Sequence, residues 1–338
     1  MNLEELHQVD VYRRHFMDAR VWEPAVRQVC AAHGLACGRV RAGLAGTYPT
    51  FLVDERWVVK FFGRLFDGAV AFTAELAAHQ LLAQDSTIPA ARLVALGQLF
   101  KQVDRWAWPY LIFAFVPGLS MGEQIEAVHF REMQKQARWL GKVTRRLHQL
   151  SLKGNNHFVP AWEPFVDFLE QQTAVCVAHH QLWGHLPPHL IDQIPEFLLP
   201  VPDLVDWRQS PHLIHADLTA DHLLGVVENG RFHPTGLIDF GDAMVGNIYY
   251  ELVALHIDLF RCDKRLLPAF FAGYDLPQSF RDNFAVKAMC MTLLHRFDVM
   301  AGAVNYLPPL AKIENLSDLA ALLWHIDRDL WNLYKNSL

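Results

Sequence analysis

The sequence has few of the features that mark nucleic-acid-binding proteins. Its 30 Lys and Arg residues are outnumbered by 36 Asp and Glu residues, which leaves a net charge of −6. Proteins that bind nucleic acid usually carry a basic excess or a stripe of Lys and Arg, and this chain has neither. We therefore expect no nucleic-acid partner, while the mildly acidic balance is compatible with a cationic small ligand.

Disulfides and membrane segments are not indicated either. The five cysteines are scattered and contain no Cys-x-x-Cys pair, which predicts a reduced chain in the cytoplasm. The residues after Met1 are acidic rather than basic, so no signal peptide is expected. The longest uncharged apolar run, residues 106–121, is too short to span a bilayer and is interrupted by Pro109 and Pro117. We expect a soluble protein that does not bind membranes.

Apolar residues make up 52 % of the 338 residues, which is enough for a sizeable core. The first third of the chain has mainly β-type patterns, and Asp54-Glu55-Arg56 supplies a hairpin turn. The expected strands are Gly38–Gly43, Thr47–Asp54, Trp57–Phe62, Arg92–Leu99 and Pro109–Phe115, and the expected helices are Asp18–His33 and Gly68–Gln84.

After Pro117 and Gly118 the pattern becomes mainly helical. Helices are expected over Ile125–Leu150, Glu163–Ala178, from Tyr249 onward and over Leu319–Tyr334 with Ser317 as N-cap, with a proline-rich loop at 187–202 and a β-rich segment at His212–Phe240. This layout predicts an α+β fold with a small β-rich N-lobe over residues 1–115 and a larger helical C-lobe over residues 116–338.

The β-rich segment of the second part brings together residues that carry chemistry. Asn229-Gly230 predicts a two-residue hairpin turn, because both residues tolerate a positive φ. Such a hairpin would fold Asp239 back beside the loop that holds Asp217 and His222. Transfer of a phosphoryl group needs metal ligands near the phosphates and a separate carboxylate that orients the attacking hydroxyl. Asp217 suits the second role, and Asp239 with His222 suits the first.

The same residues carry a resemblance to a known family. The run His215-Ala-Asp217-Leu-Thr-Ala-Asp-His222, followed by Asp239-Phe-Gly, resembles the catalytic loop and metal-binding motif of the aminoglycoside phosphotransferase and choline kinase-like family, which has the protein-kinase-like fold. By this resemblance Asp217 is the catalytic base and Asp239 binds the metal, Mg²⁺. From its place beside Asp217, His215 is expected to brace the loop by hydrogen bonding rather than to react.

The resemblance also places a nucleotide site in the first part of the chain. Lys60, in a predicted strand, stands where the family has the lysine that holds the α- and β-phosphates. Glu75, fifteen residues later, stands where the family has the carboxylate that forms an ion pair with that lysine. The loop from Gly43 to Gly46 takes the place of the nucleotide-covering loop. The backbone of Ala114 and Val116, beside Phe113 in the gatekeeper position, would bind the adenine. ATP and GTP both remain open, because these contacts are made by backbone groups.

One position departs from the family pattern. The family usually has Asn where this chain has His222. Imidazole is a softer and bulkier ligand for Mg²⁺ than an amide oxygen, so the number of bound metals is open. Macrolide phosphotransferases resemble this chain in having His there.

The function expected from these features is a small-molecule kinase that transfers the γ-phosphate of a nucleoside triphosphate to a hydroxyl group. The resemblance favours an aminoglycoside acceptor and hence antibiotic resistance, with macrolides and other hydroxylated metabolites as alternatives. Asp242, Glu251 and Asp258 are candidates for pairing with amines of the acceptor. A monomer and a dimer are both compatible with the sequence.

Two other functions start from the same residues. His215-x-Asp217 with His256 or His295 mimics the metal triad of non-haem iron oxygenases, although those enzymes use a sheet of many strands. A non-catalytic kinase-like binding protein is the other alternative, with His222 as its only support. A further cluster, Cys176 with the histidines from His179 to His189, lacks the spacing of a zinc site and is expected to line a helix end and a loop.

Overall fold

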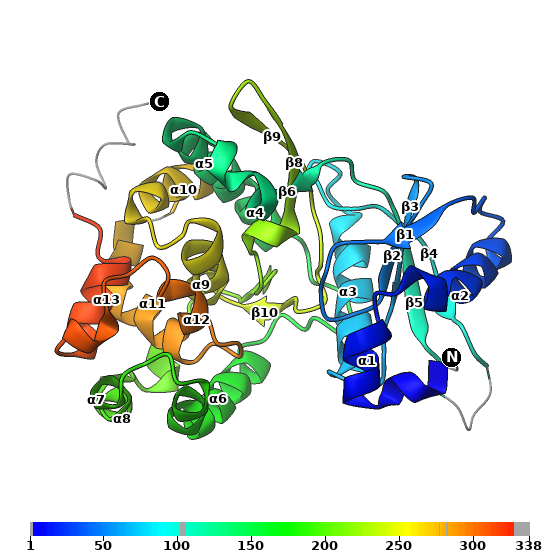
Figure 1. Cartoon of the computed structure of the whole chain (residues 1–338). Coiled ribbons are helices and arrows are strands. Elements are labelled where there is room, and N and C mark those ends of the chain that lie inside the picture. Colours follow the sequence, from blue (N-terminus) through cyan, green and yellow to red (C-terminus); the bar gives the residue numbers. More distant parts are fainter. Residues whose placement is uncertain (1–2, 102–105, 277, 282, 328–338) are drawn as a thin grey trace. The chain divides into compact units, whose positions relative to one another are not determined.

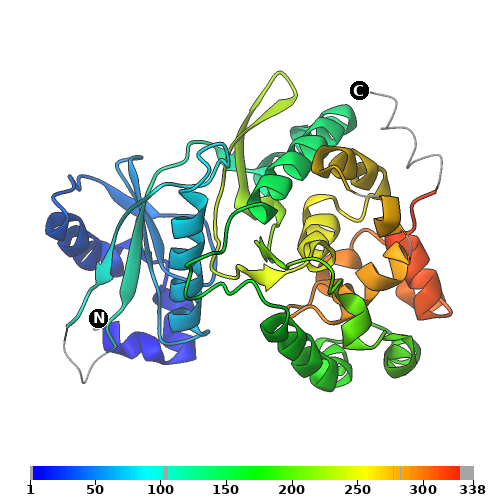
Figure 2. The same ribbon diagram turned by 180° about the vertical axis from the view of Figure 1, so that it is seen from behind.

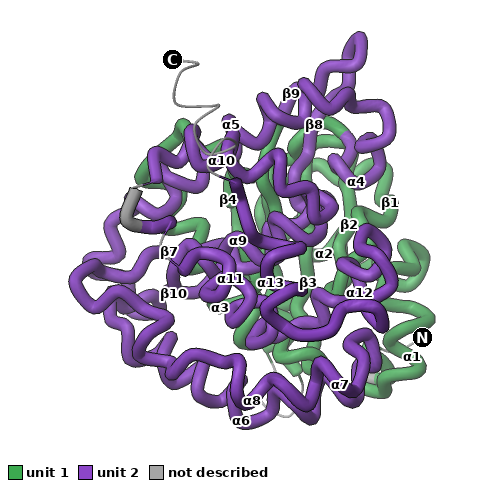
Figure 3. Tube along the Cα trace, turned by 90° about the vertical axis from the view of Figure 1, so that its left-hand side faces the viewer, with its two compact units in different colours: residues 1–118, 235–242 green, residues 119–234, 243–338 purple. Residues whose placement is uncertain are grey.

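The computed structural model describes residues 3–101, 106–276, 278–281 and 283–327. It contains two compact units. Unit 1 comprises Met1–Gly118 and Thr235–Asp242, and unit 2 comprises Leu119–Pro234 and Ala243–Leu338 (Figure 3). The short segment 235–242 therefore belongs with the N-terminal part although it is distant from it in sequence. The functional roles predicted for residues 1–115 and 116–338 stay predictions.

Unit 1 is built on an antiparallel sheet with the order β1-β2-β3-β5-β4 (Figure 1). Its strands are β1 (Val40–Ala42), β2 (Thr50–Val53), β3 (Trp57–Phe61), β4 (Leu93–Gln98) and β5 (Pro109–Ala114). The predicted hairpin between β2 and β3 is present, with Thr50 opposite Lys60 and Val53 opposite Trp57. Asp54 and Glu55 form its turn in the left-handed region, with φ of 52° and 53°.

Helices cover the two faces of this sheet (Figures 1 and 2). They are η1 (Leu3–His7), α1 (Val9–His15), α2 (Ala19–Ala32) and α3 (Gly68–Leu82). Along β5, Tyr110 and Ile112 pack in the same cluster as Trp22 of α2, whereas Leu111 and Phe113 pack in the cluster that contains Ala71 of α3. This alternation follows from the two-residue period of a strand, and burial of each large side chain stabilises the unit by about 1.5–3 kcal/mol.

Unit 2 is mainly helical. Its longer helices are α5 (Phe130–His148), α6 (Glu163–Trp183), α9 (Ile248–Ala254), α10 (Leu267–Tyr274), α11 (Phe284–Leu293) and α13 (Leu316–Trp324). Its shorter ones are α4 (Met121–Gln124), α7 (Pro188–Ile191), α8 (Ile194–Phe197), α12 (Met300–Ala303), the 3₁₀ turns η2 (Ile125–Ala127), η3 (Val201–Leu204), η4 (Ala220–His222), η6 (Lys264–Leu266), η7 (Gln278–Arg281) and η8 (Leu310–Lys312), and the π-helical turn η5 (Leu255–Leu259).

Several predicted helix boundaries in unit 2 were wrong. The helix expected from Ile125 starts at Phe130, because Val128 is extended and His129 takes the N-cap position. The proline-rich segment expected as a loop contains α7, α8 and η3, whose prolines stand in the first turn, where no N–H partner is lost. Helix α13 is capped by Asn315 rather than Ser317, and the part predicted beyond residue 327 lies outside the described residues.

The next strands lie on either side of the predicted catalytic loop, His215–His222. β7 (His212–Ile214) pairs with β10 (Met244–Gly246), and β6 (Leu119–Ser120) lies beside β8 (Leu223–Glu228), which pairs with β9 (Arg231–Leu237). The end of β9, from Thr235 on, belongs to unit 1. The hairpin turn predicted at Asn229-Gly230 is confirmed, with φ of 52° and 72°. Within the described ranges no helix is long and apolar enough to cross a bilayer.

Candidate active site

An ion-pair cluster in unit 1 is centred on a buried lysine of the central strand β3. Nζ of Lys60, on β3, lies 2.7 Å from Oε2 of Glu75 on α3 and 2.8 Å from Oδ1 of Asp239. The ammonium group also lies 5.7 Å and 5.4 Å from the ring centroids of Tyr48 and Phe62. The ion pair expected between Lys60 and Glu75 is thus present, and one lysine connects two carboxylates that are 164 residues apart in the sequence.

Burial and charge act against each other in this cluster. Burial disfavours the charged lysine, but the carboxylates of Asp239 and Glu75 outweigh that effect and raise the pKa of Lys60 above its ordinary value. Burial raises the pKa of Glu75 to about 7, although Lys60 opposes the shift. The side chains of Lys60 and Glu75 are 8 % and 2 % exposed, whereas that of Asp239 is 34 % exposed. Asp239 is therefore the member that a ligand can reach.

Asp239 is held by an unusual backbone. Its φ is 64°, in the left-handed region that non-glycine residues seldom occupy. The next residue, Phe240, is fully buried, and its ring packs edge-on against His79 of α3. Gly241 follows, and a Cβ there would lie 3.4 Å from Oδ1 of Asp239. The Asp-Phe-Gly run is thus anchored by its middle residue, which fixes the carboxylate beside Lys60.

The predicted nucleotide loop and hinge also lie in unit 1. The N–H of Gly43 donates to the carbonyl of Thr50, and a Cβ at Gly43 would lie 3.0 Å from the Thr50 side chain, whereas Gly46 faces open space. At the end of β5 the N–H of Ala114 donates to the carbonyl of Arg92 at 2.8 Å. Only the carbonyl of Ala114 can therefore serve a base, so any donor must come from elsewhere, such as Val116.

In unit 2, a buried glutamate holds the backbone of the predicted catalytic loop. Oε2 of Glu251, on α9, accepts the N–H of His215 at 2.6 Å and that of Ala216 at 3.4 Å. Nε2 of His148 lies 3.8 Å from the same oxygen. Ala216 has a φ of 65°, and its carbonyl lies 3.4 Å from Nε2 of His295. Glu251 thus holds the N–H groups of the two residues that precede Asp217, and His295 holds the carbonyl group of the second.

Asp217 and His222 lie side by side at the two ends of this loop. Nδ1 of His222 lies 2.6 Å from the carbonyl oxygen of Asp217 and 3.7 Å from its Oδ2. A carbonyl only accepts hydrogen bonds, so the Nδ1 atom of His222 carries a proton. The side chains of Asp217 and His222 are 22 % and 18 % exposed. Both can therefore contact a substrate while the loop keeps them in place.

Two carboxylates that the sequence offered as partners for acceptor amines have other contacts. Glu251 is fully buried and binds the catalytic loop, so its assignment to the acceptor was wrong. Asp258 is exposed, but its Oδ1 accepts the N–H of Ala220 at 2.7 Å. The role of Glu251 was missed because it depends on a contact between residues 36 positions apart. A glutamate in an otherwise apolar helix was the only available signal.

The alternative metal sites are not formed. No group of three or more His, Cys, Asp or Glu side chains in the described residues could hold a metal ion. His256 instead binds the carbonyl of Leu323. The histidines in and after α6 make separate contacts instead of converging on one point. These contacts are His180 with the carbonyl of Leu293, His185 with Asp298, and His189 with the carbonyl of Ile313. The oxygenase triad and the zinc site therefore lack the geometry they require.

Comparison with known proteins decides the family. The model of the phosphotransferase enzyme family matches residues 39–283, which include the Lys60 cluster and the catalytic loop. The chain belongs to the phosphotransferase enzyme family. This assignment confirms the family that the sequence motifs resemble. It also confirms the predicted enzyme class, a phosphotransferase that acts on hydroxyl groups.

Individual relatives of this phosphotransferase are distant. Lysine-specific demethylase JMJ21 of Arabidopsis thaliana is 23 % identical over an alignment of 283 residues, gaps included, and the match covers 67 % of this chain and 30 % of that protein. The chain thus spans less than a third of the length of that curated relative. Among solved structures, the GDP complex of an aminoglycoside 2'-phosphotransferase is 18 % identical with a TM-score of 0.63, covering 88 % of this chain and 97 % of that one.

A second solved structure, a microcompartment-associated aminopropanol kinase, is 18 % identical with a TM-score of 0.53, covering 83 % of this chain and 93 % of that one. At this identity both structures show the fold, and they confirm the predicted α+β kinase-like class. Asp239 lies in unit 1, and Asp217 and His222 lie in unit 2. The expected convergence of these three residues stays a prediction, as do their roles.

Proposed function

We propose that this phosphotransferase is a small-molecule kinase that transfers the γ-phosphate of ATP or GTP to a hydroxyl group. The observation that carries the proposal is the arrangement at Lys60, whose ammonium group contacts Glu75 and Asp239 at 2.7 Å and 2.8 Å. The Lys60 ammonium group is fixed between the inaccessible carboxylate of Glu75 and the accessible carboxylate of Asp239. A lysine held in this way is suited to bind phosphate oxygens. The solved relative that was captured with GDP supports nucleotide binding.

The nucleotide is assigned to residues of unit 1. Lys60 holds the α- and β-phosphates, and Glu75 keeps the ammonium group aimed and charged. The loop from Gly43 to Gly46 covers the phosphates. The carbonyl of Ala114 accepts a hydrogen bond from the base, since its N–H is bound to Arg92, and the N–H of Val116 donates one. These backbone contacts do not choose between adenine and guanine.

Magnesium is the metal that fits the donors present. Asp239 offers a partly exposed carboxylate, and Mg²⁺ in proteins is commonly held by one or two carboxylates together with substrate phosphates. His222 would add Nε2, because its Nδ1–H is directed to the Asp217 carbonyl. When bound, the metal would neutralise charge on the phosphates.

Asp217 is assigned to the acceptor. Its carboxylate orients the hydroxyl group and takes the proton as the acceptor oxygen bonds to phosphorus and the bond from phosphorus to the leaving nucleoside diphosphate breaks. Glu251 supports this step indirectly, because its hydrogen bonds to His215 and Ala216 fix the loop that carries Asp217. His215 is a positioning residue, as the sequence suggested.

For the acceptor, an aminoglycoside is the first candidate, since the fold neighbours include an aminoglycoside phosphotransferase. A second candidate, a hydroxylated metabolite or macrolide with few amines, is favoured by two observations. Glu251 cannot meet a substrate amine, because it is fully buried. In addition, the guanidinium group of Arg296 lies 5.5 Å from the Phe168 ring and contacts Met244, which pairs with the residue before His215. A cation there disfavours a polycationic acceptor.

A nucleotide-consumption assay tests the proposal. Purified protein would be screened with ATP and with GTP against aminoglycosides, macrolides, choline and homoserine, with Asp217→Ala as the matched inactive variant. Consumption that depends on both the acceptor and Asp217 would support a kinase and identify the acceptor class. Consumption that is unchanged in Asp217→Ala would refute the catalytic assignment.

A further inference from the structure

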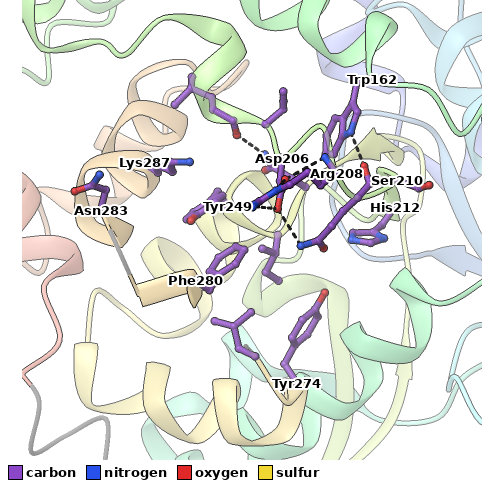
Figure 4. A pocket seen from close by; sticks show the side chains of 16 residues that line it. Trp162, Asp206, Arg208, Ser210, His212, Tyr249, Tyr274, Phe280, Asn283 and Lys287 are labelled. Carbon is purple, nitrogen blue, oxygen red and sulfur yellow. Dashed lines mark hydrogen bonds and ion pairs between the residues drawn. The ribbon is translucent and has the colours of Figure 1, made fainter. Parts of the chain in front are cut away.

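Unit 2 contains a pocket of about 330 Å³ that the proposed reaction does not use (Figure 4). It is lined by the beginning of α9, the end of α10, the beginning of α11 and the segment before β7. One lining residue, His212, pairs with Gly246 at one end of the two-stranded β7–β10 ribbon. At the other end of the ribbon Ile214 pairs with Met244, and the catalytic loop begins directly after Ile214. A volume near 300 Å³ is at the small end of the range for ligand sites.

The walls of the pocket are aromatic. Trp162 and Tyr249 are each 7 % exposed, and the Tyr249 ring stacks on Phe280 with centroids 4.3 Å apart. The indole N–H of Trp162 donates to the carbonyl of Gln209, so the ring is fixed as a wall. Such rigid rings prefer to pack against another flat ring, since they lose little entropy on binding.

The charge in the pocket is one net positive. Arg208 and Lys287 are its cations and Asp206 is its carboxylate. Nε of Arg208 lies 2.9 Å from Oδ1 of Asp206, so this pair is neutral. Lys287 lies 5.8 Å from the Tyr249 ring centroid, and Figure 4 shows it across the pocket from Trp162. Burial, followed by the effect of His148, lowers the pKa of His212 to about 4, so His212 is neutral at pH 7.

A chain of buried and half-buried polar side chains leads from this pocket toward the predicted catalytic loop. The hydroxyl group of Tyr274, a lining residue, lies 2.8 Å from Nδ1 of His148, and the His212 ring stacks on the His148 ring at 5.2 Å. Nε2 of His148 lies 3.8 Å from Oε2 of Glu251, the atom that accepts the His215 N–H. The first links are a hydrogen bond and a ring stack, and the last is an approach of two buried polar atoms at 3.8 Å, beyond hydrogen-bond distance; all lie within unit 2.

We propose that this pocket binds a small aromatic carboxylate and that its occupancy is transmitted to the catalytic loop through Tyr274, His148 and Glu251. The aromatic ring lies among Trp162, Tyr249 and Phe280. The single negative charge meets Lys287, because Arg208 is already neutralised by Asp206. A ligand that orders Tyr274 also orders His148, because a hydrogen bond joins the two, and it therefore strengthens the hold of Glu251 on the loop backbone.

Binding is tested by calorimetry with indole-3-acetate and its neutral isostere indole-3-acetamide. We expect the carboxylate to bind with Kd below about 1 mM and the amide at least tenfold more weakly. Lys287→Gln should abolish this preference, whereas Lys312→Gln, an exposed lysine outside the pocket lining, should keep it. Absence of carboxylate binding, equal affinity for both compounds, or an unchanged preference in Lys287→Gln would each overturn the proposal.

Transmission is tested by hydrogen exchange of a peptide that spans residues 213–222. Saturating indole-3-acetate should slow exchange of this peptide about fivefold in the wild type. Tyr274→Phe keeps the ring but removes the hydroxyl bonded to His148, so exchange in this variant should not respond when its pocket is saturated. No change in the wild type, or an equal change in Tyr274→Phe, would refute the link. Neither measurement requires turnover, so the outcome is independent of the kinase proposal.

Discussion

Oε2 of Glu251 accepts the backbone N–H of His215 at 2.6 Å, and both residues are fully buried. Glu251 thus sets the conformation of the loop that carries Asp217. A charged acceptor that serves buried backbone donors contributes more than a neutral one, and its loss leaves those donors unsatisfied.

Glu251→Ala should therefore destabilise unit 2 and suppress turnover together. We expect a loss of about 2–5 kcal/mol, because two buried N–H groups lose their acceptor, with Glu251→Gln intermediate. Asp258→Asn is the control, since Asp258 also accepts a loop N–H but is exposed. Denaturant unfolding combined with steady-state kinetics would measure both effects. A Glu251→Ala protein as stable as Asp258→Asn would show that the contact is dispensable.

Variants of Lys60 and Asp217 should separate nucleotide binding from catalysis. Lys60→Ala should weaken nucleotide binding, because the phosphates lose their cation. Asp217→Ala should leave nucleotide affinity within about threefold of wild type and lower kcat by about 10²–10⁴, the usual contribution of a general base. Calorimetric titration with nucleotide and kinetics at saturating substrate would test the pair. Equal loss of nucleotide affinity in the two variants would contradict the assignment.

His222→Asn should change the metal preference. An amide oxygen is a harder donor than imidazole nitrogen and suits Mg²⁺, whereas imidazole suits later transition metals. We expect the ratio of Mn²⁺-supported to Mg²⁺-supported kcat/KM to fall in this variant. Measuring both rates over a range of metal concentrations would reveal the shift. An unchanged ratio would remove His222 from the metal site.

The contact of α5 with α10 depends on two glycines. A Cβ at Gly141 would lie 2.0 Å from the carbonyl oxygen of Phe270, and one at Gly273 would lie 1.9 Å from that of Arg138. Gly141→Ala should therefore cost about 1–3 kcal/mol through overpacking. Gly302→Ala in α12 is the matched control, because its Cβ would meet only ordinary contact at 3.6 Å. Thermal unfolding should show a drop in Tm for the first variant alone.

Acid should unfold this protein through its buried histidines. Burial lowers the pKa of His256 and of His295 to about 4, from about 6.5 in the unfolded chain. Because the unfolded state binds more protons between these values, stability is full above pH 6.5 and falls toward pH 4 by about 3 kcal/mol per histidine. Urea unfolding of wild type and His256→Gln at pH 7 and pH 5 would test this. The variant should lose less stability on acidification, and an identical loss would exclude His256.

Much of the local structure could be predicted because its causes are local. The turns at Asp54-Glu55 and Asn229-Gly230 depend on residues that tolerate positive φ, and both hairpins formed as expected. The helix boundaries that were predicted wrongly depend on competition among possible cap residues and prolines. The alternative helix ends that these residues offer differ little in free energy. The start of α5 at Phe130 is such a case.

The order of motifs along the chain by itself determined the family, the α+β kinase-like class and the pairing of Lys60 with Glu75. Only the tertiary structure decided that Asp239 completes the Lys60 cluster, that Glu251 serves the catalytic loop rather than a substrate, and that an aromatic pocket adjoins the His148 chain. The physical reason is the same in each case. These features depend on contacts between residues far apart in sequence, and neither spacing nor composition records which buried polar groups will meet.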